Sequence, residues 1–68
     1  MENSIAELIE AKRQIDSTLH KLRETVKTLE AKENSDRYKS QITLAERRIK
    51  AFELAVTLIE RERENIKN

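Results

Sequence analysis

Hydrophobic residues recur at alternating intervals of three and four along two separate stretches of the chain. In the first stretch the apolar positions of the repeat hold Ile5, Leu8, Ile15, Leu19, Leu22, Val26 and Leu29, with Lys12 as the polar exception. In the second stretch they hold Tyr38, Ile42, Ala45, Ile49, Phe52, Val56, Ile59 and Ile66, with Arg63 as the polar exception. This heptad spacing is typical of a coiled-coil seam, so the sequence predicts two amphipathic helices.

The two repeats are out of phase, which favours a hairpin over one continuous helix. The heptad position of Ile5 and Leu19 would continue at residues 33 and 40, but the second stretch holds that position at 42 and 49. Coiled coils absorb insertions of three or four residues by local over- or unwinding, and a shift of two is not among these. The jump falls around AKENSD, residues 31–36, where Asn, Ser and Asp favour helix caps and turns.

We therefore predict an all-α fold, an antiparallel two-helix hairpin that forms a single domain over residues 1–68. One helix is expected over about 5–32, a turn over about 33–35 and a second helix over about 36–65. Ser4 followed by Glu7 is the pattern of a capping box at the start of the first helix.

A turn centred near residue 34 predicts eight layers across the seam, each pairing like heptad positions. The expected pairs are Leu29 with Tyr38, Val26 with Ile42, Leu22 with Ala45, Leu19 with Ile49, Ile15 with Phe52, Lys12 with Val56, Leu8 with Ile59 and Ile5 with Arg63. Lys12 and Arg63 would each lay the aliphatic part of the side chain over the residue opposite and keep the charge in water.

The helix over 36–65 carries more apolar surface than one seam uses. Projected at about 100° per residue, a second stripe lies beside its seam, and Leu54 lies at the outer margin of that stripe. The set consists of Leu44, Ala51, Leu54, Ala55 and Leu58. A hairpin partner covers only one seam, so we predict that these residues form a partner-binding face. The alternative is self-association, in which two hairpins bury the same face in a four-helix bundle.

Composition narrows the function further. The chain has 68 residues, no glycine, proline or cysteine, and a net charge of +1 from 14 basic and 13 acidic residues. The two signs are intermingled, which disfavours a nucleic-acid or anionic-membrane surface. No apolar run approaches the roughly 18 residues of a membrane span, and the N-terminus is too polar for a signal peptide. We expect a soluble, cytoplasmic protein.

Catalytic and metal chemistry is not indicated by the residues present. His20 is the only histidine, and Asp16 four residues before it supplies one further ligand where a metal site needs three or four. No glycine is present to form a phosphate-binding loop, and a two-helix hairpin offers no enzyme-sized pocket. The sequence therefore predicts neither an enzyme nor a cofactor or metal site.

One part of the sequence resembles a known family. Tyr38 in DRYKSQ follows the turn, and after about a dozen residues comes KAFELAVTLI, with Ala51, Ala55, Val56 and Ile59 in the family's register. Over roughly residues 15–60 the chain is similar to the small two-helix co-chaperones of bacterial type III secretion needle subunits.

The resemblance implies a cytoplasmic hairpin that binds and stabilises a second, tetratricopeptide-like chaperone. That chaperone would hold the needle subunit and prevent its premature polymerisation. Ala51 and Ala55 would then lie toward the partner, and Phe52, Val56 and Ile59 in the hairpin seam. Two other readings stay open: a coiled-coil module that pairs only with itself, and a small regulator that blocks the helix-binding groove of an unrelated target.

Overall fold

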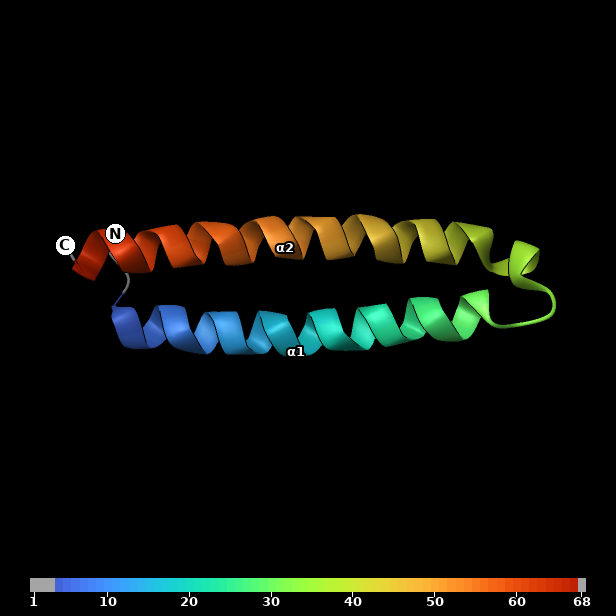
Figure 1. The fold of residues 1–68 in the computed structure, drawn as a ribbon, viewed down its shortest axis with the longest axis horizontal. Helices are drawn as coiled ribbons and strands as arrows, with labels where there is room; N and C mark the ends of the chain where they lie inside the picture. The colour runs from blue at the N-terminus through green and yellow to red at the C-terminus, as the bar shows by residue number, and fades with distance from the viewer. Residues whose placement is uncertain (1–3, 68) are drawn as a thin grey trace.

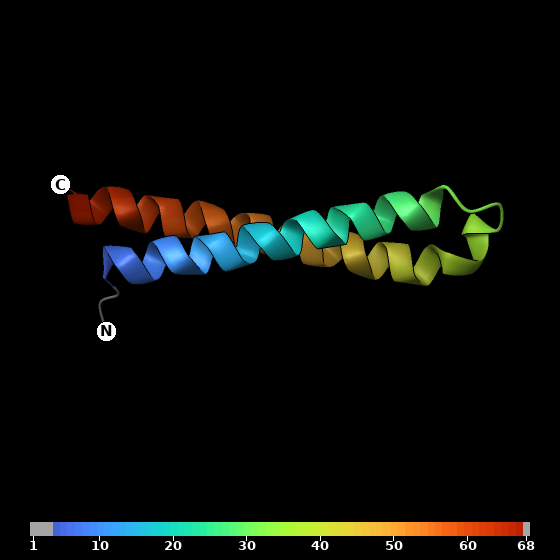
Figure 2. The same cartoon turned by 90° about the horizontal axis from the view of Figure 1, so that it is seen from below.

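The chain folds into an antiparallel helical hairpin, as predicted. The computed structural model describes residues 4–67, with side chains described over 4–66. Helix α1 spans Ile5–Glu30, a 3₁₀ turn η1 spans Ser35–Tyr38, and helix α2 spans Lys39–Lys67. The two long helices lie side by side in a rod of 51 × 17 × 15 Å, with the connection at one end (Figure 1). Seen from below, they cross near the middle of their lengths (Figure 2).

The predicted capping box starts α1. The Ser4 side chain accepts a hydrogen bond from the backbone N–H of Glu7 over 3.1 Å, and the Ser4 N–H donates to Glu7 Oε1 over 3.0 Å. These bonds satisfy two of the backbone donors that a helix N-terminus leaves without partners. The box therefore sets where the first helix begins.

The connection between the helices differs from the expected tight turn. Helix α1 ends at Glu30, two residues before the predicted boundary, and α2 begins only at Lys39, after the 3₁₀ turn. The Arg37 N–H donates to the carbonyl of Asn34 over 2.9 Å, but the Asn34 side chain makes no capping bond. No residue in the described part of the chain has a positive φ. The described residues of the reversal use no left-handed conformation, so this turn requires no glycine.

A cation–π contact joins the two ends of the turn. The Lys32 ammonium lies 5.5 Å from the centroid of the Tyr38 ring, and Tyr38 is half-buried. Such contacts contribute about 0.5–1 kcal/mol at exposed sites.

The other end of α2 extends to Lys67, two residues beyond the predicted boundary.

The core is the single seam between α1 and α2. Its buried residues are Leu8, Leu19, Leu29 and Ala45. The remaining predicted seam residues between positions 12 and 63 are half-buried, and Ile5 and Ile66 at the open end of the hairpin are exposed. None of the described side chains is fully enclosed, because two helices cover the seam from only two directions.

Cross-helix ion pairs indicate which residues face each other. Arg23 Nη2 donates to Glu53 Oε2 over 2.6 Å, and Lys12 Nζ lies 3.8 Å from Glu60 Oε1. The predicted layers put Ala45 opposite Leu22, the neighbour of Arg23, yet Ala45 lies eight residues from Glu53, about 12 Å along the helix. Side chains lean toward the N-terminus of their own helix, which covers part of that span.

The rest of the span favours a register in which α2 is shifted by about one turn relative to the predicted layers. Leu22 would then face Ile49 rather than Ala45, and Leu19 would face Phe52 rather than Ile49. The seam is intact in both registers, because a one-turn shift moves each residue to the next seam residue of the partner helix. The shifted register joins unlike heptad positions in each layer, and the late start of α2 at Lys39 moves the reversal in the same direction. The choice between the two registers is a prediction that cysteine pairs can test.

Substitution of a central seam residue should unfold the hairpin. Ile49→Asp places a charge between the helices with no partner to compensate it, so we expect loss of most helical circular dichroism at 222 nm. Thr57→Asp is the matched control, because Thr57 is exposed in the same helix. A folded Ile49→Asp chain with native thermal stability would contradict the seam.

Disulfide trapping should distinguish the two layer registers. The chain has no cysteine, so paired cysteines can be introduced without background. We expect Leu19→Cys/Phe52→Cys to oxidise rapidly within one chain, and Leu19→Cys/Ile49→Cys to oxidise more slowly, because a disulfide needs Cα atoms about 5.5 Å apart. Non-reducing gel mobility at low protein concentration separates intramolecular from intermolecular products. The reverse order of rates would restore the predicted layers.

Candidate partner-binding face

The exposed leucines lie on one side of α2, and Ile9 of α1 is a further exposed apolar residue outside the seam, at 42%. We call the set Leu44, Ala51, Leu54, Ala55 and Leu58 the leucine face. Leu44, Leu54 and Leu58 are 49%, 61% and 53% exposed, and Ala51 is also exposed. Ala55 is half-buried, because it directly precedes the seam residue Val56 and borders the seam. The structure thus leaves four of the five residues accessible and places the fifth at the edge of the core.

Leu44, Ala51 and Leu58 form a straight row at intervals of seven residues. The row spans about 21 Å along α2. Leu54 lies beside it, four residues before Leu58. The small side chain of Ala51 lowers the middle of the row, so a neighbouring helix can approach closely there. An apolar row of this length is a typical contact surface for an amphipathic helix.

Helix α1 extends this side of the hairpin with uncharged side chains. Ala11, Thr18 and Thr25 each directly precede an α1 seam residue, as Ala55 does on α2, so they border the same side of the seam. The Thr18 hydroxyl donates to the Gln14 carbonyl over 3.1 Å, and the Thr25 hydroxyl donates to the Lys21 carbonyl over 2.9 Å. Their hydroxyls are satisfied within α1, which leaves the methyl groups as contact surface.

The opposite side of the seam is charged. Arg23, Glu53 and Glu60 each directly follow a seam residue, and they supply the two cross-helix ion pairs. Arg23, Lys27, Glu46, Lys50 and Glu53 surround a shallow hollow there, with Val26 and Ile49 at its base. Exposed ion pairs contribute only about 0–1 kcal/mol each. Their larger effect is to make this side of the hairpin hydrophilic, in contrast to the leucine face.

Lys12 is the polar residue of the α1 seam, and it is half-buried. Its ammonium donates to Asp16 Oδ2 over 2.8 Å, and this hydrogen bond raises the pKa of Lys12 above its ordinary value of 10.5. The carboxylate charges of Asp16 and Glu60 act in the same direction. A raised folded-state pKa means that the charged form stabilises the fold at neutral pH. This contribution is lost only as the pH rises through the folded-state pKa.

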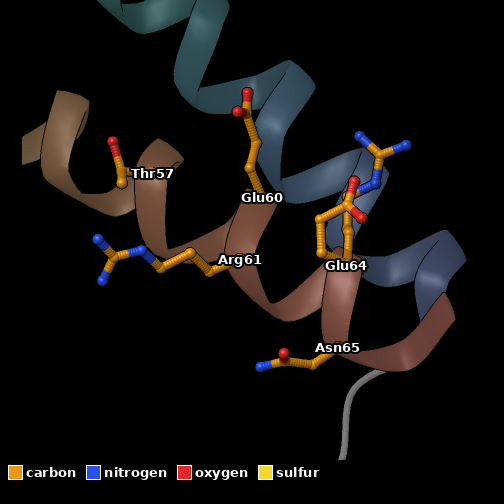
Figure 3. A pocket seen from close by; sticks show the side chains of 6 residues that line it. Thr57, Glu60, Arg61, Glu64 and Asn65 are labelled. Atoms are coloured by element: carbon orange, nitrogen blue, oxygen red, sulfur yellow. The ribbon is translucent and has the colours of Figure 1, made fainter. Parts of the chain in front are cut away.

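A hollow near the C-terminal end of α2 is an open stretch of surface. It is lined by Thr57, Glu60, Arg61, Arg63, Glu64 and Asn65, all from α2. Figure 3 shows Thr57, Glu60, Arg61 and Asn65 pointing in different directions from the helix. Because one helix supplies the entire lining, the hollow has no opposing wall to hold a substrate.

Metal ligation has no candidate in the part of the chain that the structure describes. His20 is exposed on α1, and no three histidine, aspartate or glutamate side chains gather there in a way that could hold an ion. The described residues also contain no helix that is long and apolar enough to cross a membrane.

The sequence prediction missed the charged surroundings of the leucine face. Arg47, Arg48 and Arg61 are exposed and lie three or four residues from Leu44 or Leu58. The signal was present in the sequence, because residues three and four apart are neighbours on a helix. It was hidden by the near-zero net charge of the whole chain, which averages the two sides of α2.

Known proteins offer no guide to this face. Comparison of the chain with protein-family models, with curated protein sequences and with solved structures gave no match.

Proposed function

We propose that this chain is a non-enzymatic helical adaptor that binds a protein partner through the leucine face. The observation that carries the proposal is the half-exposed state of Leu44, Leu54 and Leu58, the three leucines of α2. Three of the four isoleucines of α2, in contrast, are half-buried in the seam. Burial of one leucine side chain stabilises by about 1.5–3 kcal/mol. A partner that covers all three therefore gains several times that amount of gross hydrophobic free energy.

The partner surface that fits is a helix or the groove of a helical-repeat protein. The row of Leu44, Ala51 and Leu58 is straight and about 21 Å long, which suits helix-in-groove packing. A second helix can approach Ala51 closely, as in other interfaces built on small residues.

The specific form of the proposal is a cytoplasmic co-chaperone of a type III secretion needle subunit. Its partner would be a tetratricopeptide-like chaperone, which holds the needle subunit and prevents premature polymerisation. The division of KAFELAVTLI supports this form: Ala51 is exposed, while Phe52, Val56 and Ile59 are half-buried against α1, as the resemblance implies. Ala55 departs from it in part, because it borders the seam.

Leu58→Asp should separate binding from folding. The Leu58 side chain is already 53% exposed, so we expect the circular dichroism signal at 222 nm and the melting temperature to change little. Binding to the partner should be lost, because the aspartate would put a charge into the apolar contact in place of the leucine. Leu19→Asp is the contrasting variant, since Leu19 is 4% exposed and its replacement should unfold the chain. Unfolding of Leu58→Asp would assign the leucine face to the core.

Site-specific photo-crosslinking in the native host should identify the occupant of the leucine face. A benzophenone amino acid at position 58 should yield a product that contains a different, helical-repeat protein. The same amino acid at Lys50, an exposed residue on the ion-paired side of α2, is the control. Mass spectrometry of the product decides the outcome. A product made of two copies of this chain would contradict the adaptor and favour the self-associating module.

A further inference from the structure

Charged side chains on α2 are segregated between its two sides. Glu46 and Glu53 face the hollow that also contains Arg23 and Lys27 of α1, and Glu60 approaches Lys12. These carboxylates therefore have cations of α1 close by. Glu46, Glu53 and Glu60 therefore lie on the side of α2 that faces the charged residues of α1.

The leucine face is bordered mainly by cations. The charged residues three or four positions from Leu44 or Leu58 are Arg47, Arg48, Arg61 and Glu62, three cations against one anion. Within residues 4–66, the three arginines form no ion pair. Figure 3 shows the Arg61 side chain directed away from Glu60 and Glu64, although both carboxylates are on the same helix. These guanidinium groups are free to meet a partner.

A second copy of the chain does not supply acidic partners for all three arginines. If two α2 helices met antiparallel through the row of Leu44, Ala51 and Leu58, Arg47 of one copy would lie beside Arg61 of the other. If they met in parallel, Arg47 would lie beside Arg48 of the other copy and Arg61 beside Glu62, so repulsion at one end offsets attraction at the other. The antiparallel geometry brings like charges together and the parallel one gains no net attraction, so neither favours self-association.

We infer that the leucine face docks a partner helix whose apolar row is bordered by aspartate or glutamate side chains. This inference rests on the proposed function and specifies the chemistry of the partner. Arginine is suited to the role, because its planar guanidinium can form two parallel hydrogen bonds with one carboxylate. The leucines supply the buried area, and Arg47, Arg48 and Arg61 select the partner by charge and set its position.

Synthetic helical peptides provide the test. Two peptides of about 21 residues, long enough to cover the row from Leu44 to Leu58, carry the same leucine and alanine row, bordered by glutamate in one and by lysine in the other. A third peptide carries glutamine at the border. Binding to the fluorescently labelled 68-residue chain is measured by anisotropy. We expect the acidic peptide to bind about tenfold or more tightly than the basic one, because opposite charges attract across the border.

Salt and charge reversal check the cause of the preference. The preference for the acidic peptide should largely disappear at 1 M salt, where the Debye length is about 3 Å. The variant Arg47→Glu/Arg61→Glu should bind the basic peptide better than the acidic one. The control variant Arg13→Glu/Lys27→Glu changes two exposed α1 residues away from the leucine face by the same total charge and should keep the original preference.

The outcomes separate this inference from the proposed function. Equal binding of all three peptides, lost in Leu58→Asp, would overturn the charge selection and leave the leucine face as a docking site. No binding of any peptide would overturn both. Sedimentation equilibrium of the unmodified chain should show a monomer at micromolar concentration. A dimer that is abolished by Leu58→Asp would overturn the inference in favour of a second copy.

Discussion

The hairpin depends on a single apolar seam that two helices cannot enclose. Leu19 and Leu8 are buried, but most of their neighbours in the seam are only half-buried, and no described side chain is fully enclosed. A chain of this size buries only about 60% of the surface that it exposes when unfolded. The side chains along the two open sides of the seam therefore determine which surfaces the hairpin presents to solvent or to a partner.

These two sides are built differently. One is closed by charged side chains, with Arg23 and Glu53 in direct contact and Lys12 between Asp16 and Glu60. The other carries the leucine face on α2 and the alanine and threonine row on α1. Under the proposed function, a partner helix would cover the seam from this second side. Since a ligand that binds only the folded state stabilises that state, binding would couple directly to the stability of the hairpin.

The heptad pattern was sufficient to predict two helices and the separation of seam from surface on α2, and the spacing of Ser4 and Glu7 predicted the capping box. Each of these depends on periodicity or on contacts between residues three and four apart, which belong to one helix. The boundaries around the turn were less accurate. Asn34 suggested a capped, tight reversal, whereas the chain uses the 3₁₀ turn Ser35–Tyr38 and delays α2 to Lys39. The competing turn geometries differ little in local sequence preference, so the sequence could not separate them.

The sequence by itself determined that Leu44, Leu54 and Leu58 do not share the seam with Phe52 and Val56, because a helix of fixed pitch places the two sets on different sides. The tertiary structure decided which residues of α1 and α2 stand opposite each other. A shift by one turn leaves every seam residue in the seam and changes no burial pattern, so the hydrophobic repeat has no preference between registers. The length of the turn and the cross-helix pairs Arg23–Glu53 and Lys12–Glu60 favour the shifted register. Both are properties of two helices together, which the periodicity of one helix does not contain.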